Sequence, residues 1–360
     1  MYLDLSVEEL CGQLIVGGFE GTELPGDLGQ ALAAGERAGA ILFKRNLETP
    51  AQAADLCGAI AETAPPDLPP FIGVDEEGGR VSRLPDESLR LPPMRAVGAT
   101  GDTDLARRTG QALGRVLGAL GFNLDFAPVL DVDSNPKNPI IGDRSFSRDP
   151  AEVARLGRAF ASGLIGSGVM TCGKHFPGHG DTHLDSHLDL PHVAHDLPRL
   201  RRVELKPFSE VGNEVVALMS AHVVYAALDP LVPATLSRAI CTDLLRRQLS
   251  FEGVLFSDDL EMRAVADRLP IEHTAVQAID AGCDTLLICK DFSLQERAQG
   301  ALVQRAKTDT AFRDRCVEAV ERSIRARRRF PPPHPRWPDE AAAGALRDVI
   351  AEICAHGRPQ

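Results

Sequence analysis

Short, almost wholly apolar runs recur along this chain, and the segments between them are long enough to hold helices. We predict eight of these runs as strands, at residues 14–18, 40–43, 71–74, 124–128, 169–173, 217–221, 253–256 and 285–288. Strands that are apolar on both faces are typical of a parallel sheet that is covered on both sides. The pattern therefore predicts a buried parallel sheet.

Helical spacing marks the segments between these strands. In residues 149–165, Val153, Leu156, Phe160 and Leu164 recur every three or four positions, which is the period of an amphipathic helix. Similar spacing predicts helices at residues 235–249, 312–328 and 341–355. Alternating strands and helices are compatible with two folds, a closed (β/α)8 barrel and a wide doubly wound sheet. Because no G-x-G-x-x-G motif follows the first strand, the α/β barrel of the TIM type is favoured.

The two ends of the chain add shorter elements. Ser6 and Glu9 form a capping-box pattern, which predicts that a helix precedes the first strand. A proline-rich stretch ends regular structure after Phe330. We therefore predict a barrel domain at residues 1–330 and, at residues 331–360, a linker with a short C-terminal helical extension. The last helix could pack back on the barrel or form a dimer contact.

Composition narrows the class of protein. Apolar residues make up 44% and charged residues 25% of the chain, as is usual for a soluble globular protein. The net charge of -12 argues against a nucleic-acid partner. The basic run at 325–329 is interpreted as a solvated helix face.

Localisation is predicted to be cytoplasmic. The eight cysteines are scattered without a C-x-x-C pair, as buried thiols in a reducing compartment would be. The first ten residues carry acidic groups and lack the apolar core of a signal peptide. No run approaches the ~18 apolar residues of a membrane span, so no membrane association is expected.

Polar residues follow the predicted strands. They are Asp75, Glu76 and Glu77 after the third, Asp131 and Asp133 after the fourth, Lys174 and His175 after the fifth, His222 after the sixth, Asp258 and Asp259 after the seventh, and Lys290 and Asp291 after the eighth. In a barrel these strand ends meet at one face, where barrel enzymes keep their active sites.

The loop after the fifth strand is rich in histidine. His179, His183 and His187 are spaced by four, which would suit a metal on a helix, but Pro177 and Gly178 make a helix unfavourable. We expect no metal and no cofactor.

Proton transfer fits this loop better. In Asp185-Ser-His187 the carboxylate can fix the imidazole tautomer, so that the free nitrogen gives and takes protons. A loop-capping Asp beside a surface His is the alternative.

Charged residues on the other loops suit sugar recognition. Asp258 follows an apolar strand and is either a catalytic carboxylate or part of a helix cap. Carboxylates and charged donors bind hydroxyl pairs and ring oxygens, and the candidates for this role are Asp75, Arg83, Arg144, Lys174 and His175. Salt-bridge scaffolding is the structural alternative for these groups.

Several motifs together resemble those of the NagZ-type β-N-acetylglucosaminidases of glycoside hydrolase family 3. They are VDEEGGRV at 74–81, IGDRSF at 141–146, KHFPGHGDT at 174–182, DSH at 185–187 and FSDDLEM at 256–262. The resemblance covers roughly residues 5–330, in the same order. It implies that residues 1–330 are a family 3 catalytic barrel.

The resemblance also implies roles for these residues. Asp258 would be the nucleophile of a retaining reaction, and His187, polarised by Asp185, the acid/base. Asp75, Arg83, Arg144, Lys174 and His175 would hold N-acetylglucosamine in the first subsite.

The implied activity is that of an exo-β-N-acetylglucosaminidase (β-N-acetylhexosaminidase). It would act on peptidoglycan turnover fragments, N-acetylglucosaminyl-1,6-anhydromuropeptides, in cell-wall recycling. The expected partner is this small glycan, and the expected state is a monomer or weak dimer. A β-glucosidase or β-glycoside phosphorylase of the same family is the alternative. Outside the family, the alternatives are a catalytically inactive sugar-binding protein and a metal-dependent hydrolase.

Overall fold

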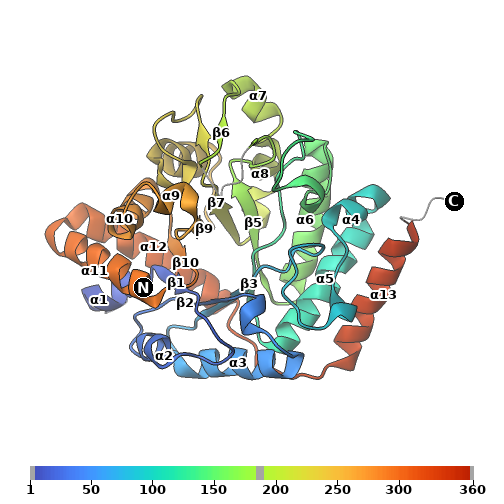
Figure 1. Ribbon diagram of the computed structural model, residues 1–360, viewed down its shortest axis with the longest axis horizontal. Helices are drawn as coiled ribbons and strands as arrows, with labels where there is room; N and C mark the ends of the chain where they lie inside the picture. Colours follow the sequence, from blue (N-terminus) through green and yellow to red (C-terminus); the bar gives the residue numbers. More distant parts are fainter. Residues whose placement is uncertain (1–4, 184–189, 357–360) are drawn as a thin grey trace.

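A closed barrel of parallel strands forms the centre of the molecule (Figure 1). The computed structural model describes residues 5–183 and 190–356. Within these residues, eight strands close the barrel in the order β1-β10-β9-β7-β5-β4-β3-β2. The strands are β1 Ile15–Gly17, β2 Gly39–Leu42, β3 Phe71–Val74, β4 Leu124–Asp125, β5 Met170–Phe176, β7 Ala217–Ser220, β9 Val254–Asp259 and β10 Thr285–Ile288. Each overlaps a predicted strand, and the predicted (β/α)8 barrel is confirmed. Outside it, β6 His192–Val193 pairs with β8 Val224–Tyr225.

Helices surround the barrel (Figure 1). They are α1 Val7–Gly12, α2 Gly26–Ala33, α3 Pro50–Thr63, α4 Met94–Thr100, α5 Thr103–Leu120, α6 Pro150–Gly166, α7 Leu197–Arg202, α8 Lys206–Val211, α9 Arg263–Ala266, α10 Ile271–Ala281, α11 Phe292–Thr308, α12 Thr310–Arg329 and α13 Glu340–His356. The predicted capping box precedes α1, where Ser6 N donates to Glu9 Oε2 over 2.7 Å and Glu9 N donates to Ser6 Oγ over 3.1 Å. Asp149 caps α6 through Ala151 N, and Pro150 begins that helix.

One helix differs from its prediction. The segment predicted as a helix from residue 235 is helical only over Ala239–Gln248, with π-type hydrogen bonding. A separate 3-10 turn, Ala234–Leu236, precedes it. The Thr235 hydroxyl is hydrogen-bonded to Ser220 Oγ and His222 Nδ1. These barrel contacts hold Thr235 outside the helix.

The C-terminal helix packs back on the barrel. α13 lies beside α5 at the edge of the molecule (Figure 1), and Leu346 and Ile353 are buried. Arg108 of α5 makes two hydrogen bonds of 2.7 Å to the Glu352 carboxylate. Of the two alternatives for this helix, the structure therefore shows packing against its own barrel.

Apolar side chains fill the barrel. The Phe256 ring packs edge-on against Phe71 and Phe126, with centroids 5.2 and 5.4 Å apart. These three rings belong to one buried apolar cluster inside the barrel. All eight cysteines are unpaired, and seven of them are buried. No helix in the described ranges is long and apolar enough to cross a membrane.

Arg327 closes the opposite end of the barrel. The basic run was predicted to be solvated, but Arg327 is fully buried. It donates to the carbonyl oxygens of Ala38 and Pro69 and to Gln13 Oε1, over 2.8–3.2 Å. Burial lowers the pKa of Arg327 to about 9, which still leaves it charged at neutral pH. The solvated interpretation is therefore wrong for this residue, because its position on α12 turns it toward the barrel axis.

Candidate active site

The carboxyl ends of the strands enclose a cavity of about 480 Å³. The predicted site residues that line it are Asp75, Arg83, Arg144, Lys174, His175 and Asp258. These residues come from distant parts of the sequence, and closure of the barrel brings them around one space.

Two of these side chains come from barrel strands directly above the apolar filling. Phe256 of β9 and Cys172 of β5 belong to this filling. Asp258 and Lys174 lie two residues further along the same strands, at points where the strand register shifts, and both line the cavity. Charged side chains therefore lie directly above the apolar side chains that fill the barrel.

Two buried cations and two carboxylates form a connected network on one wall of the cavity. Lys174 Nζ lies 2.6 Å from Asp75 Oδ1 and 2.6 Å from Glu77 Oε1. Arg144, from the short turn Gly142–Arg144, donates to both Glu77 oxygens over 2.8 Å. The Glu77 side chain is 1% exposed, whereas that of Asp75 is 15% exposed. Both carboxylates line the cavity, and Asp75 is the more accessible of the two.

The charges of this network stabilise one another. Burial alone would raise the pKa of Glu77, but the adjacent Arg144 and Lys174 hold it well below its usual range. Burial would lower the pKa of Lys174 and of Arg144, but the carboxylates raise both. All three groups are therefore charged at neutral pH, and they present fixed donors where sugar hydroxyls can bind.

His175 is oriented by a buried carboxylate. Its Nδ1 lies 2.6 Å from Asp131 Oδ2, and the backbone N–H groups of His175 and His179 donate to the same carboxylate. Burial would raise the pKa of Asp131, but the charge and hydrogen bond of His175 and the contacts from His179 lower it. Asp131 therefore fixes the ring and leaves Nε2 of His175 for a ligand.

Asp258 and Asp259 have different surroundings. Asp259 N donates to Asp258 Oδ1 over 2.8 Å. Asp259 Oδ1 accepts from Glu261 N and Cys289 N, and burial raises the pKa of Asp259 to about 7. The next helix, α9, begins at Arg263 without a side-chain cap. The helix-cap interpretation of Asp258 is therefore wrong. Asp258 and Asp259 both line the cavity, and Asp259 also holds the loop through its contacts with Glu261 N and Cys289 N.

Arg83 stands at the edge of the cavity. Its Nη2 lies 3.9 Å from Asp75 Oδ2, and its guanidinium lies over the Phe43 ring at 5.7 Å. Glu76 Oε2 accepts from the backbone N–H groups of Arg83 and Leu84, which holds this loop in place. Burial raises the pKa of Glu76 to about 7.

Asp185 and His187 fall at 184–189, outside the described residues, so their roles stay predictions. The chain before them is fixed. The side-chain amide of Asn138 donates to the carbonyl oxygens of His179 and Thr182 over 2.9 and 3.1 Å. This contact joins the loop after β5 to the loop after β4.

The sequence alone does not assign Glu77, Asp131 or Asp259 to the site. All three are polar residues that come after predicted strands, and that position is the signal that the sequence offers. Their partners are far away in sequence, since Glu77 binds Arg144 and Asp131 binds His175. Such pairs cannot be read from spacing.

A closed (β/α)8 barrel whose strand ends hold carboxylates and cations around a small cavity defines a class of barrel enzymes suited to polyhydroxylated ligands. The family model described as "Glycosyl hydrolase family 3 N terminal domain" matches residues 6–325. The chain belongs to this family and is a glycoside hydrolase, as the motif resemblance predicted.

Curated relatives agree with this assignment. The chain is 42% identical over 288 residues to a protein named "Beta-hexosaminidase" from Pseudomonas aeruginosa PAO1, which covers 80% of this chain and 85% of the relative. It is 43% identical over 289 residues to a Thiobacillus denitrificans protein of the same name, which covers 78% of this chain and 79% of the relative.

Solved structures show the same fold. A family 3 β-N-acetylglucosaminidase from Paenibacillus sp. FPU-7 superposes with a TM-score of 0.90 at 36% identity, over 97% of this chain and 69% of that one. Native NagZ from Neisseria gonorrhoeae superposes with a TM-score of 0.80 at 32% identity, over 96% of this chain and 98% of that one.

Proposed function

We propose that this protein is a retaining exo-β-N-acetylglucosaminidase that removes terminal β-linked N-acetylglucosamine from peptidoglycan turnover fragments in the cytoplasm. The observation that carries the proposal is that Asp258 shares one cavity with Asp75, Lys174 and Arg144. A carboxylate thereby faces fixed hydroxyl-binding groups across a space of sugar size. The names of the relatives support the N-acetylhexosaminide as substrate.

The proposed reaction has two displacements. Asp258 attacks the anomeric carbon, and His187 gives a proton to the departing oxygen. A covalent glycosyl-enzyme results. The neutral imidazole of His187 then takes a proton from water, and that water displaces Asp258. Two inversions give net retention of configuration. Asp185 would hold the imidazole in the tautomer that this exchange requires.

Substrate binding would use the network described above. Lys174, Arg144 and His175 donate to hydroxyl groups, and Asp75 accepts from them. Because Glu77 and Asp131 already fix these side chains, little reorganisation is needed when the sugar binds. Arg83 would close the side of the subsite next to Phe43.

Removal of the nucleophile tests the proposal. Asp258→Ala should lower kcat for release of p-nitrophenol from its N-acetyl-β-glucosaminide by more than ~10⁴-fold, with an unchanged circular dichroism spectrum. Asp267→Ala is the matched control, because its side chain is 57% exposed and pairs only with Arg263 among the described contacts. Retained activity in Asp258→Ala would refute the proposed mechanism.

Two further comparisons separate the alternatives. Wild-type enzyme should cleave the N-acetylglucosaminide far faster than the glucoside, whereas a β-glucosidase would reverse this order. Addition of phosphate should leave the products unchanged, whereas a phosphorylase would form a sugar phosphate. Proton NMR should show the β-anomer first, and initial release of the α-anomer would contradict retention.

A further inference from the structure

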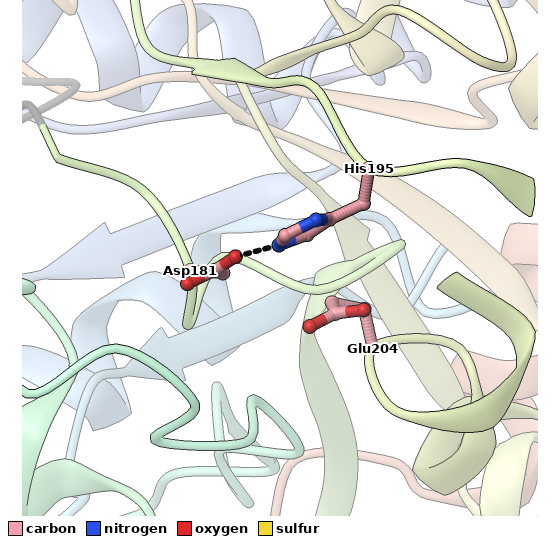
Figure 2. A group of neighbouring side chains, drawn as sticks. All are labelled: Asp181, His195 and Glu204. Atoms are coloured by element: carbon pink, nitrogen blue, oxygen red, sulfur yellow. Dashed lines mark hydrogen bonds and ion pairs between the residues drawn. The ribbon is translucent and has the colours of Figure 1, made fainter. Parts of the chain in front are cut away.

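Three potential metal ligands meet outside the cavity. They are Asp181 on the loop after β5, His195 between β6 and α7, and Glu204 between α7 and α8. One ligand atom from each lies within 4.8 Å of the other two. Figure 2 shows the His195 ring directed at the Asp181 carboxylate, with the Glu204 carboxylate beside both. His195 Nε2 is hydrogen-bonded to Asp181 Oδ2.

Only one of the two oxygens of the Glu204 carboxylate has a hydrogen-bond partner among the described residues. Its side chain is 1% exposed. Oε1 accepts from Arg199 Nη2 over 3.0 Å and from Ser134 Oγ over 3.3 Å. Oε2 is buried and has no hydrogen-bond partner among the described residues. An unpaired buried carboxylate oxygen is costly, so its presence indicates a missing partner.

We propose that Asp181, His195 and Glu204 bind a divalent transition-metal ion such as Zn²⁺. Two carboxylates and one imidazole are a suitable ligand set for this ion, whereas Ca²⁺ and Mg²⁺ prefer oxygen ligands alone. Bonds of about 2.0–2.2 Å in a tetrahedral site place the ligand atoms roughly 3.3 Å apart. This separation is within the 4.8 Å limit on the distances between the ligand atoms of the three residues. Water would complete the coordination.

The charge of the three side chains and their access to solvent also suit a divalent cation. Arg199 offsets one of the two carboxylates, so the ion meets a site that still carries negative charge. The ion takes the place of the proton between Asp181 and His195, and that proton is released to solvent. The His195 side chain is 36% exposed, which gives the ion a route from solvent.

The site differs from the one that histidine spacing suggested. It uses none of His179, His183 or His187, and Asp181 and Glu204 are separated by 23 positions. An ion here would cross-link the chain after β5 to the chain around α7. Metal binding to the folded state alone raises the apparent stability by mass action, so the melting temperature should increase with metal concentration.

Calorimetric titration with ZnCl₂ tests the proposal on chelator-treated full-length protein. Wild type should bind one Zn²⁺ per chain. His195→Ala and Glu204→Gln should each weaken binding by at least ~100-fold, since even residues that only contact metal ligands contribute 10–100-fold. The zinc-dependent rise in melting temperature should disappear in both variants. Their melting curves in EDTA show whether they fold, and Glu204→Gln keeps the shape of the buried side chain.

His192→Ala is the matched control, because His192 is an exposed histidine three positions before His195, and it should bind like wild type. A parallel titration in His187→Ala should also give one Zn²⁺, which excludes the predicted acid/base as the ligand. Failure of wild type to bind zinc would show that the cluster is an ion pair only. Unchanged binding in both His195→Ala and Glu204→Gln, or loss of binding in His187→Ala, would equally overturn the proposal.

Discussion

Glu77 illustrates how a single residue supports the site. Its two oxygens bind Lys174 and Arg144 at 2.6–2.8 Å in a nearly solvent-free position. The three charges were brought out of water together, and each depends on the others. The removal of one partner from such a group costs more than the group contributes as a whole, because the remaining charges stay buried and unpaired.

Glu77→Gln should therefore reduce the free energy of unfolding by roughly 3–5 kcal/mol, measured by urea unfolding. The loss follows because the buried Arg144 loses its paired carboxylate and the buried Lys174 keeps only Asp75. Glu87→Gln is the control: its side chain is 86% exposed and lies 4.0 Å from Arg90, so the change should stay below ~0.5 kcal/mol. An equally small effect for Glu77→Gln would mean that the network does not anchor the site.

Strand β9 ends in two adjacent carboxylates, Asp258 and Asp259, which both line the cavity. They differ in their contacts, since Asp259 Oδ1 accepts from the backbone N–H groups of Glu261 and Cys289. Burial raises the pKa of Asp259 to about 7, above the ~4 of an unfolded chain. Between these pH values the folded protein holds a proton that the unfolded chain has released. Stability from this group is therefore full below pH ~4 and decreases as the pH rises toward 7.

Asp259→Asn should flatten this dependence. Asn keeps an oxygen that accepts the two backbone N–H groups, but it has no proton to lose. Between pH 5 and 7 the slope of unfolding free energy against pH should become less negative by up to ~1.4 kcal/mol per pH unit, the effect of one proton. Urea unfolding across this range measures it. In the exposed control Asp267→Asn the slope should match wild type, and a wild-type slope in Asp259→Asn as well would argue against a protonated Asp259.

The whole molecule depends on closure between its first and last strands. β1 pairs with β10, and Gly18 N donates to Ile288 O over 2.8 Å. A Cβ atom at Gly18 would lie 1.9 Å from Cys289 O, which is too close for any side chain. Glycine is thus required where the two ends of the sheet meet.

Gly18→Ala should reduce the unfolding free energy by about 1–3 kcal/mol or more, because β1 and β10 must separate to accept the methyl group. Thermal unfolding followed by circular dichroism measures the effect. Gly26→Ala at the start of α2 is the control, since nothing lies within 4 Å of its Cβ position, and it should be neutral or slightly stabilising. Equal melting temperatures for the two variants would contradict the close contact between β1 and β10 at Gly18.

The amino-acid sequence by itself determined the order of strands and helices, because apolar runs and helical spacing are local properties. It also indicated Asp75, Lys174 and Asp258, because each comes just after a predicted strand and closure of a barrel must bring the carboxyl ends of its strands together. Only the tertiary structure decided which charges pair and which side chains are buried. Glu77 with Arg144, Asp131 with His175 and the burial of Arg327 depend on distances between residues far apart in sequence. Those distances are set by the register and closure of the whole barrel, and no local pattern contains them.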